Sequence, residues 1–298
     1  MRTLRRALRL PSARLAAGVL IVVAVAAVFG HRLAPLDPLA QDSAHVLSGP
    51  SAGHLLGTDG LGRDVLSRLV AGTASSIVAT LEAVGSALVV GVVLGVASLW
   101  LGRGYEWVSL RFVDSLQTLP YVVFVVAVVG VLGNGLSQSM LAIGLLYSPI
   151  FFRVSRAASL TLLRAQYVEA AELFGGGRLW ILRTHLWSKI LPTIAVTAAQ
   201  ASAECLLVVQ SLSFLGIGVQ PPAPTWGGML ADDLGFLAQQ PWAPLVPALT
   251  IMITVGALNA LADAVSDSAD LPVLDASPAP AGTAGPVQEV PDATVPVR

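Results

Sequence analysis

The chain contains 298 residues, of which 55% are hydrophobic and only 12% are charged, and its mean hydropathy is +0.75. About 25% of the residues of a soluble domain are charged, so this composition excludes an ordinary soluble protein and indicates one embedded in a lipid bilayer. The formal net charge of −1 says little, because in a membrane protein the side on which Lys and Arg lie matters more than their sum. No nucleic-acid partner is expected. The one cysteine, Cys205, excludes an internal disulfide, and its apolar neighbours predict a small buried thiol.

The N-terminal segment is basic and continues into an apolar run. Residues 15–30 are apolar and follow five arginines: Arg2, Arg5, Arg6, Arg9 and Arg14. This pattern fits either a cleaved signal peptide or a first membrane helix. Because further apolar segments follow, we favour a retained helix and assign residues 1–34 to a cytoplasmic basic N-terminus and the first transmembrane helix.

Residues 35–72 are polar and rich in proline and glycine, which predicts a folded extracytoplasmic loop. Asp59 and Arg63 have the i,i+4 spacing of a helical ion pair. We interpret them, together with Asp64, as part of a capped surface helix in preference to a substrate contact.

Five more apolar segments predict membrane helices, which gives six spans in an all-α protein. They cover residues 74–101, 112–132, about 136–152, 190–215 and 244–265. Gly91 and Gly95, one turn after Ala87, are typical of closely packed membrane helices. Residues 103–111 are expected to be a short polar connection. A loop at residues 216–242 is expected to hold four residues at the level of the lipid headgroups: Pro221, Pro222, Trp226 and Trp242.

Several polar residues fall inside the predicted spans: Glu82, Asp114, Glu204, Asn259 and Asp263. An ionisable group near the centre of a bilayer costs at least roughly 2.5 kcal/mol, so Glu82 is expected to face other helices, water or the interface. Asp114 is expected at the interface, paired with Arg111. Asn259 and Asp263 share one face of the last span.

Residues 166–192 form a polar, Arg-rich segment between apolar ones. Glu169 lies opposite a helix face that carries five apolar residues: Leu160, Leu163, Tyr167, Ala171 and Phe174. Three consecutive glycines at residues 175–177 permit one helix to stop and another to start at an angle, and residues 179–190 are again amphipathic. We call residues 166–192 the elbow. The pattern predicts a helix, a glycine corner and a helix that dock into a groove on another protein.

The distribution of basic residues predicts the topology. With six spans both termini lie on one side, and that side carries all of the seventeen Lys and Arg residues except Arg32, Arg63 and Arg68. Basic residues favour the cytoplasmic side, so the elbow and both termini are predicted to be cytoplasmic.

Three stretches resemble a known family. Glu169, Ala170, Ala171 and Gly175 are spaced as in the EAA loop of permease subunits of binding-protein-dependent ABC importers. HLLGTDGLGRDVLSRLVAG (residues 54–72) and SLSFLGIGVQPPAPTWGGML (residues 211–230) resemble signatures of the dipeptide, oligopeptide and nickel permease subfamily. The resemblance covers roughly residues 14–267. It marks eleven residues as family signatures: Gly57, Thr58, Asp59, Gly62, Arg63, Asp64, Phe214, Gly216, Pro221, Pro222 and Trp226.

The resemblance implies a type I ABC importer transmembrane domain, with its core at residues 73–267, in the inner membrane of a prokaryote. It implies that Tyr167, Glu169, Ala170, Ala171 and Gly175 couple this chain to separate ABC ATPase subunits. A second homologous permease would complete the pore, an extracytoplasmic binding protein would deliver the solute, and peptides are the default cargo. The pattern is broken before SLSF, where Val209 and Gln210 stand in place of a family glutamate.

The chain is not expected to be an enzyme. Its only lysine, Lys189, lies outside any phosphate-binding GK[ST] motif, so ATP and Mg are expected to bind the partner ATPase. The four histidines are scattered in the sequence, which predicts no metal cluster and no bound cofactor: His31, His45, His54 and His185. Residues 268–298 contain six prolines and are predicted to be a disordered cytoplasmic tail.

One alternative comes from a different class. An ion- or proton-coupled carrier could use Glu82, Asp114 and Glu204 as relay groups. Such carriers commonly have inverted internal repeats, and the sequence shows none. The permease interpretation is therefore favoured.

Overall fold

The computed structural model describes residues 11–268, which are almost entirely helical. The predictions for the first arginines and for the tail at residues 269–298 lie outside the described residues. Five helices are long and apolar enough to cross a membrane: α2 (Pro11–Leu33), α3 (Val65–Ala97), α6 (Leu136–Leu163), α9 (Trp187–Phe214) and α11 (Trp242–Ser268). All five correspond to predicted spans, because a helix rising 1.5 Å per residue needs about 20 apolar residues to cross a bilayer.

The remaining predicted span is broken. Residues 103–132 form α4 (Arg103–Gln117) and α5 (Tyr121–Leu132), which are bent by 100° at the break between them. The predicted span at residues 112–132 therefore starts within α4 and is interrupted by the bend, and the predicted polar connection at residues 103–111 is the first part of α4. Pro120 explains the break, because proline has no N–H group and pushes the residue before it out of the helical conformation. The pair counts as a sixth span if both helices belong to one crossing.

Helices α3 and α6 form the tightest part of the bundle, and glycine lets their backbones approach. A Cβ atom at Gly91 would lie 2.6 Å from the Cβ atom of Phe151, and one at Gly95 would lie 2.6 Å from the carbonyl oxygen of Phe152. On the facing helix, a Cβ at Gly144 would lie 2.8 Å from the carbonyl oxygen of Ala83. The small-residue packing predicted for Gly91 and Gly95 is confirmed.

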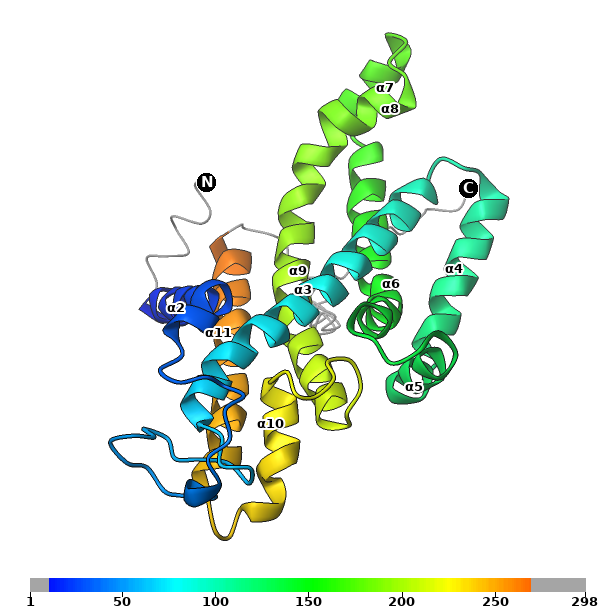
Figure 1. Cartoon of the computed structure of the whole chain (residues 1–298). Helices are drawn as coiled ribbons and strands as arrows, with labels where there is room; N and C mark the ends of the chain where they lie inside the picture. Colours follow the sequence, from blue (N-terminus) through cyan, green and yellow to red (C-terminus); the bar gives the residue numbers. More distant parts are fainter. Residues whose placement is uncertain (1–10, 269–298) are drawn as a thin grey trace, which may run out of the picture.

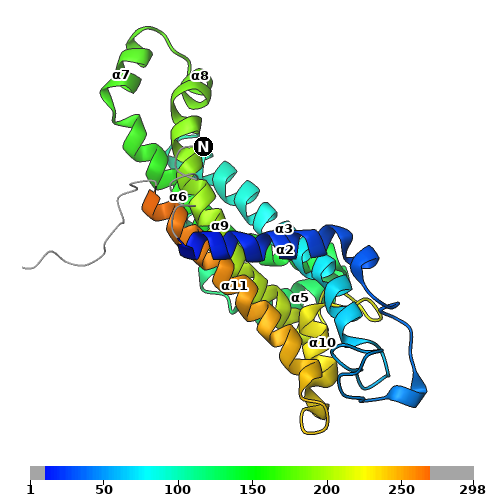
Figure 2. The same ribbon diagram turned by 90° about the vertical axis from the view of Figure 1, so that its left-hand side faces the viewer.

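The core lies between α3, α6 and α9. Ala87, Phe151 and Ile194 are among its buried residues, and Cys205 is completely buried there, as predicted. Helix α2 packs across α3 and α11 on the outside of this core (Figure 2). Its other faces carry exposed apolar residues such as Leu15, Val22 and Val28, as expected of a helix that faces lipid.

The predicted loop at residues 216–242 contains a helix, α10 (Trp226–Asp233), followed by a short turn of helix, η3 (Leu234–Phe236). Trp226 is completely buried, so its predicted position at the lipid headgroups is wrong, whereas Trp242 is half exposed. Trp226 packs with Leu206 and Ile251 and donates from Nε1 to the carbonyl oxygen of Leu69 over 3.3 Å. The indole therefore ties α10 to α3, α9 and α11.

The two ends of the molecule have different structures. At one end, α7 (Gln166–Leu173), α8 (Arg178–Ile181) and the π-helical turn η2 (Leu182–Leu186) extend beyond the bundle. At the opposite end lie residues 34–64, which include the turn η1 (Ser43–His45), together with α10 (Figures 1 and 2). The elbow and the two signature segments are thus separated by the length of the bundle.

Candidate functional site

The elbow has the predicted architecture of two helical segments joined at a glycine corner. Gly175 has a φ of +81°, and the N–H of Gly176 donates to the carbonyl oxygen of Ala171 over 2.9 Å. This six-residue closure around a left-handed glycine is the Schellman arrangement that ends helices. A residue with a Cβ atom would be strained at this φ, so Gly175 fixes the corner.

One face of the elbow is packed in a small hydrophobic cluster, and the other face is exposed. Val168, Ile181 and Leu186 are buried against one another, with Tyr167 and Ala171 packed beside them. Glu169 is exposed, as predicted for its opposite face. The Nζ atom of Lys189 lies 3.9 Å from the centre of the Tyr167 ring, a cation–π contact that helps to hold α7 against the start of α9.

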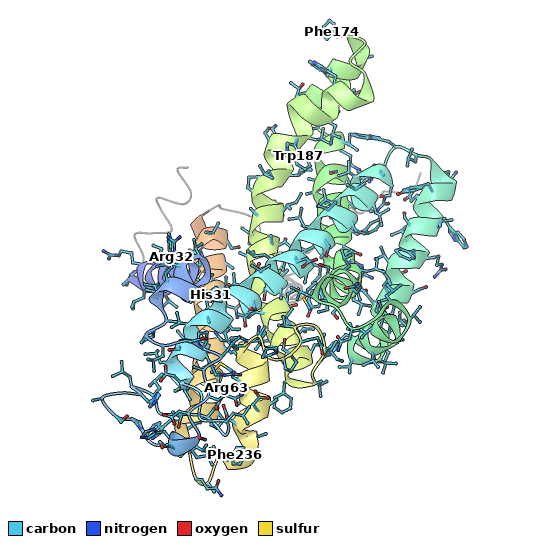
Figure 3. The ribbon with its side chains drawn as sticks, viewed as in Figure 1. His31, Arg32, Arg63, Phe174, Trp187 and Phe236 are labelled. Carbon is cyan, nitrogen blue, oxygen red and sulfur yellow. The ribbon has the colours of Figure 1, made fainter. Side chains whose placement is uncertain are left out.

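The tip of the elbow is apolar and exposed. Leu173 is 84% exposed and Phe174 is 93% exposed, and Figure 3 places Phe174 at the extreme end of the molecule. Phe174 was predicted on the anchored face, and that prediction is wrong, because α7 ends at Leu173 and Phe174 no longer follows the helical period. Ala170 lies within α7. Exposed apolar patches of this kind are typical of surfaces that bind another protein.

At the other end, Asp59 is the centre of a buried charge network. Its Oδ1 atom accepts hydrogen bonds from the backbone N–H groups of Leu61 and Arg63, each over 2.9 Å, and its Oδ2 atom accepts from Arg63 Nε over 2.7 Å. Arg68 Nε lies 3.4 Å from the same Oδ2, close enough for ion pairing. Asp232 then lies 3.3 Å from the Nη2 atoms of both arginines.

The predicted Asp59–Arg63 ion pair is therefore present, but the predicted surface helix is not. Asp59 is 1% exposed and Arg63 is 7% exposed, and both lie in a turn that precedes α3. Asp64 is the N-cap of α3, since its Oδ2 atom accepts from the backbone N–H of Ser67 over 2.8 Å. Two arginines and two backbone N–H groups hold the buried Asp59 carboxylate in place, so this part of the first signature has a structural role.

The other residues of the first signature shape the same loop. Thr58 donates its backbone N–H to the carbonyl oxygen of Ser48 over 3.0 Å, and the backbone N–H of Val65 donates to Gly57 over 3.1 Å. Gly62 has a φ of +75°, and a Cβ atom there would collide with the backbone of Asp42. The first signature is thereby folded tightly onto residues 42–48.

The second signature connects α9 to α10. Phe214 ends α9 and is half-buried, and the following residues are exposed: Gly216, Pro221 and Pro222. Gln210, which occupies the position of a family glutamate, accepts a hydrogen bond at Oε1 from the backbone N–H of Gly227 over 2.9 Å. Asn134 donates to the carbonyl oxygen of Gly216 over 3.1 Å. Sequence reasoning gave no structural role to Gln210 or Asp232, because each contacts residues distant in the chain.

Burial changes the acidity of one group beside this network. Asp233 is 1% exposed, and burial together with the nearby Asp59 charge raises the pKa of its carboxyl from 3.8 to about 6. A hydrogen bond from the backbone of Gly60 acts in the opposite direction. The midpoint of its titration therefore lies near pH 6, where an ordinary aspartate is almost fully ionised.

The polar residues of the predicted spans have separate positions. Asp114 pairs with Arg153 over 3.0 Å, so the predicted pair with Arg111 is wrong. Glu82 is half-buried on α3, and the others are exposed on α9 and α11: Glu204, Asn259 and Asp263. Among the side chains that the structure describes, neither Glu82 nor Glu204 has an ion-pair partner within 4 Å.

The comparison with known proteins identifies a family. Residues 87–270 match the family described as the inner membrane component of binding-protein-dependent transport systems. The di/tripeptide transport system permease protein of Pseudomonas aeruginosa is 34% identical over 257 residues, which is 84% of this chain and 85% of the relative. The nickel transport system permease protein of Escherichia coli K12 is 33% identical, over 87% of this chain and 94% of the relative.

A third relative is named for a different solute. The glutathione transport system permease protein of Escherichia coli O1:K1 / APEC is 33% identical over 89% of this chain and 88% of the relative. Among solved structures, the inward-facing MetNI methionine ABC transporter contains a chain with a TM-score of 0.50 and 18% identity. That match covers 67% of this chain and 96% of the other, and it supports the fold.

Proposed function

The chain belongs to the family of inner membrane components of binding-protein-dependent transport systems, and from that premise we propose that it is the permease subunit through which an ATPase drives import of a small peptide. The observation that carries this proposal is the elbow. It projects from the bundle with Glu169, Leu173 and Phe174 exposed on a backbone that Gly175 fixes. An exposed apolar tip beside a carboxylate suits a groove on a partner that moves the helices when it binds ATP.

The proposed orientation places the elbow in the cytoplasm. The elbow lies at the end opposite the signature segments (Figure 1), and it contains the basic residues Arg178, Arg183 and Lys189. Basic residues favour the cytoplasmic side. The signature segments then face outward, where a solute-binding protein would dock. A second, homologous permease would complete the translocation path, and both termini of this chain would lie in the cytoplasm.

Cysteine labelling tests the orientation. The native Cys205 is buried and should not react with a maleimide. The labelling of an introduced cysteine can therefore be compared with that of the wild-type chain. In Phe174→Cys and Leu55→Cys variants, a membrane-impermeant maleimide should label Leu55→Cys in intact cells, and Phe174→Cys only after the membrane is opened. Labelling of Phe174→Cys in intact cells would refute the proposed orientation.

Co-purification and uptake test the coupling role. The assembled complex, with ATPase, second permease and binding protein, is reconstituted in proteoliposomes loaded with ATP. Glu169→Gln together with Phe174→Ser should lower ATPase retention and peptide uptake at least tenfold. Leu55→Ser is the matched control for ATPase retention, since Leu55 is also an exposed apolar residue (62%) but lies at the opposite end. Unchanged retention and uptake in the double variant would overturn the coupling role.

Peptide is proposed as the cargo because a relative named for di/tripeptides matches most of the chain and because the signature segments resemble that subfamily. Relatives named for nickel and glutathione match at similar identity, so these solutes are the informative competitors. Uptake of a labelled dipeptide should be inhibited by unlabelled di- and tripeptides. Inhibition by glutathione or Ni²⁺ alone would assign the cargo to that solute instead.

A further inference from the structure

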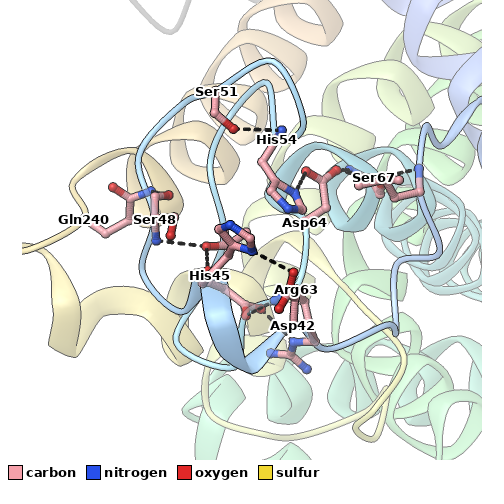
Figure 4. Close-up of polar contacts among 12 residues, drawn as sticks. Asp42, His45, Ser48, Ser51, His54, Arg63, Asp64, Ser67 and Gln240 are labelled. Carbon is pink, nitrogen blue, oxygen red and sulfur yellow. Dashed lines mark hydrogen bonds and ion pairs between the residues drawn. The ribbon is translucent and has the colours of Figure 1, made fainter.

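Two of the histidines that are scattered in the sequence come together in the folded chain. Asp42, His45 and His54 each present a ligand atom, and these atoms lie within 4.8 Å of one another. The centres of the two imidazole rings are 6.1 Å apart. The fold of this loop brings residue 54 back beside residues 42–45, which the sequence alone did not indicate (Figure 4).

We propose that Asp42, His45 and His54 bind a first-row divalent transition-metal ion, such as Zn²⁺ or Ni²⁺. Two imidazole nitrogens and one carboxylate oxygen are a ligand set for these ions, whereas Ca²⁺ and Mg²⁺ prefer oxygen ligands alone. The site is separate from the elbow, and its existence does not depend on the transport function proposed above.

The three side chains are aligned by contacts outside the cluster. His54 Nδ1 lies 3.1 Å from Oδ1 of the buried Asp64, whose other oxygen caps α3. A carboxylate can only accept a hydrogen bond, so Nδ1 carries the proton, and Nε2 of the neutral ring keeps its lone pair for a metal. A carboxylate behind a ligating histidine is a common feature of metal sites, since it fixes the ring and raises its basicity.

Asp42 is aligned in a similar way. Its Oδ1 atom accepts from the backbone N–H of Ala44 over 2.9 Å, which directs Oδ2 to His45 Nδ1 at 2.7 Å. This hydrogen bond from His45 lowers the pKa of Asp42, so the carboxylate is ionised at neutral pH. A metal ion can take the place of this hydrogen bond when the neutral His45 ring carries its proton on Nε2, which leaves the Nδ1 lone pair free for the metal.

The backbone that carries the ligands is held in place. The backbone N–H of Asp42 donates to Gly62 over 3.2 Å, and the hydroxyl of Thr58 donates to the carbonyl oxygen of His45. Gln240 reaches from the far side of the loop to the carbonyl oxygen of Ser48 over 2.7 Å. Most of the ordering needed for binding is therefore present before a ligand arrives.

The dimensions fit a single ion after a small adjustment. Bonds of about 2.0–2.2 Å in a tetrahedral site separate ligand atoms by roughly 3.3 Å. Closing from at most 4.8 Å requires movement of about an ångström, and the side chains of Asp42 and His45 are free to make it, being 48% and 59% exposed. A cavity of about 360 Å³, with Asp42, His54 and Asp64 in its wall, leaves room for water to complete the coordination.

Metal binding by the full chain in its assembled complex tests the proposal. The complex is placed in lipid nanodiscs with the affinity tag removed and is titrated with Zn²⁺ by calorimetry, and with Co²⁺ by its visible absorption. We expect about one ion per chain. His45→Ala and Asp42→Asn should each weaken binding at least tenfold. His31→Ala is the matched control, since His31 is an exposed histidine outside the cluster, and it should leave the affinity unchanged.

Two further measurements make the result independent of folding and of transport. Zn²⁺ should slow hydrogen exchange at residues 42–64 of the wild type and leave it unchanged in His45→Ala, whose exchange without metal reports whether the loop is folded. An excess of Mg²⁺ or Ca²⁺ should leave Zn²⁺ binding unchanged, because these ions prefer oxygen ligands alone. Equal binding by His45→Ala and wild type, or equal competition by Mg²⁺ or Ca²⁺, would overturn the proposal and would leave the permease function untouched.

Discussion

Replacing Asp59 by asparagine should release the loop of the first signature, because one carboxylate holds that loop on both of its oxygens. Oδ1 accepts two backbone N–H groups and Oδ2 accepts from Arg63. In Asp59→Asn, the amide nitrogen must face either the two N–H groups or the arginines, so one set of donors is left without an acceptor. Removing one member of a buried ion pair costs about 3–5 kcal/mol.

The matched control is Asp232→Asn. Asp232 contacts the same two arginines over 3.3 Å, but its side chain is 49% exposed and water can replace it. Its loss should cost no more than about 1 kcal/mol. The two variants remove the same charge from the same network and differ in burial.

Hydrogen exchange by mass spectrometry on the complex in nanodiscs measures the difference. The amides of Thr58, Gly62 and Val65 are hydrogen-bonded within the loop and report its opening. A loss of 3–5 kcal/mol corresponds to exchange that is roughly a hundred- to several-thousand-fold faster, since about 1.4 kcal/mol is a factor of ten. Acceleration of less than tenfold in Asp59→Asn, or equal acceleration in both variants, would refute the assignment of this network as the support of the loop.

Three other predictions concern the charges and the packing. The pKa of Asp233 is raised in the folded chain, so the native state holds the proton more tightly than the unfolded state, and this contribution to stability is lost as pH rises from about 4 to about 6. Asp233→Asn should therefore gain stability relative to wild type over that interval in thermal unfolding, and a constant difference would contradict the assignment. Gly91→Ala should destabilise the protein in detergent by about 1–3 kcal/mol, because the added Cβ atom would meet α6 at 2.6 Å. Gly85→Ala on the same helix has open space around the added Cβ atom, so it should be neutral or slightly stabilising. Equal effects of the two variants would refute the close approach of α3 and α6. Asp114→Asn breaks an ion pair whose partners are 51% and 55% exposed, so uptake should stay within twofold of wild type, and loss of uptake would revive the proton-relay alternative.

The features that follow from local pattern could be predicted from sequence. Long apolar runs predicted the five unbroken spans, small residues at four-residue spacing marked a close helix contact, and three glycines marked the corner of the elbow. The break at Pro120 was missed because residues 112–132 are apolar on both sides of it, and hydropathy carries no information on the direction of the chain. Phe174 was misplaced because a helical wheel does not show where the helix ends.

The features that depend on distant residues could not be predicted. Asp59 and Arg63 were interpreted as a surface pair because the local sequence does not show their burial or their contact with Asp232, more than 160 residues later. His45 and His54 read as scattered because only the folded loop brings them together. Trp226 was expected at the membrane interface because a tryptophan side chain suits a headgroup layer as well as a packed core. In each case the residue type indicated a possible role, but the local sequence did not show which distant segment would pack against the residue.

Helix α9 gives the elbow a direct mechanical connection to the opposite end of the molecule. It begins at Trp187, immediately after η2, and its 28 residues correspond to about 42 Å at 1.5 Å per residue. Ile190, Cys205 and Leu212 lie along its whole length and are all buried in the α3–α6–α9 core. Because packed interiors transmit displacement instead of absorbing it, a force on the elbow would move this core as one body.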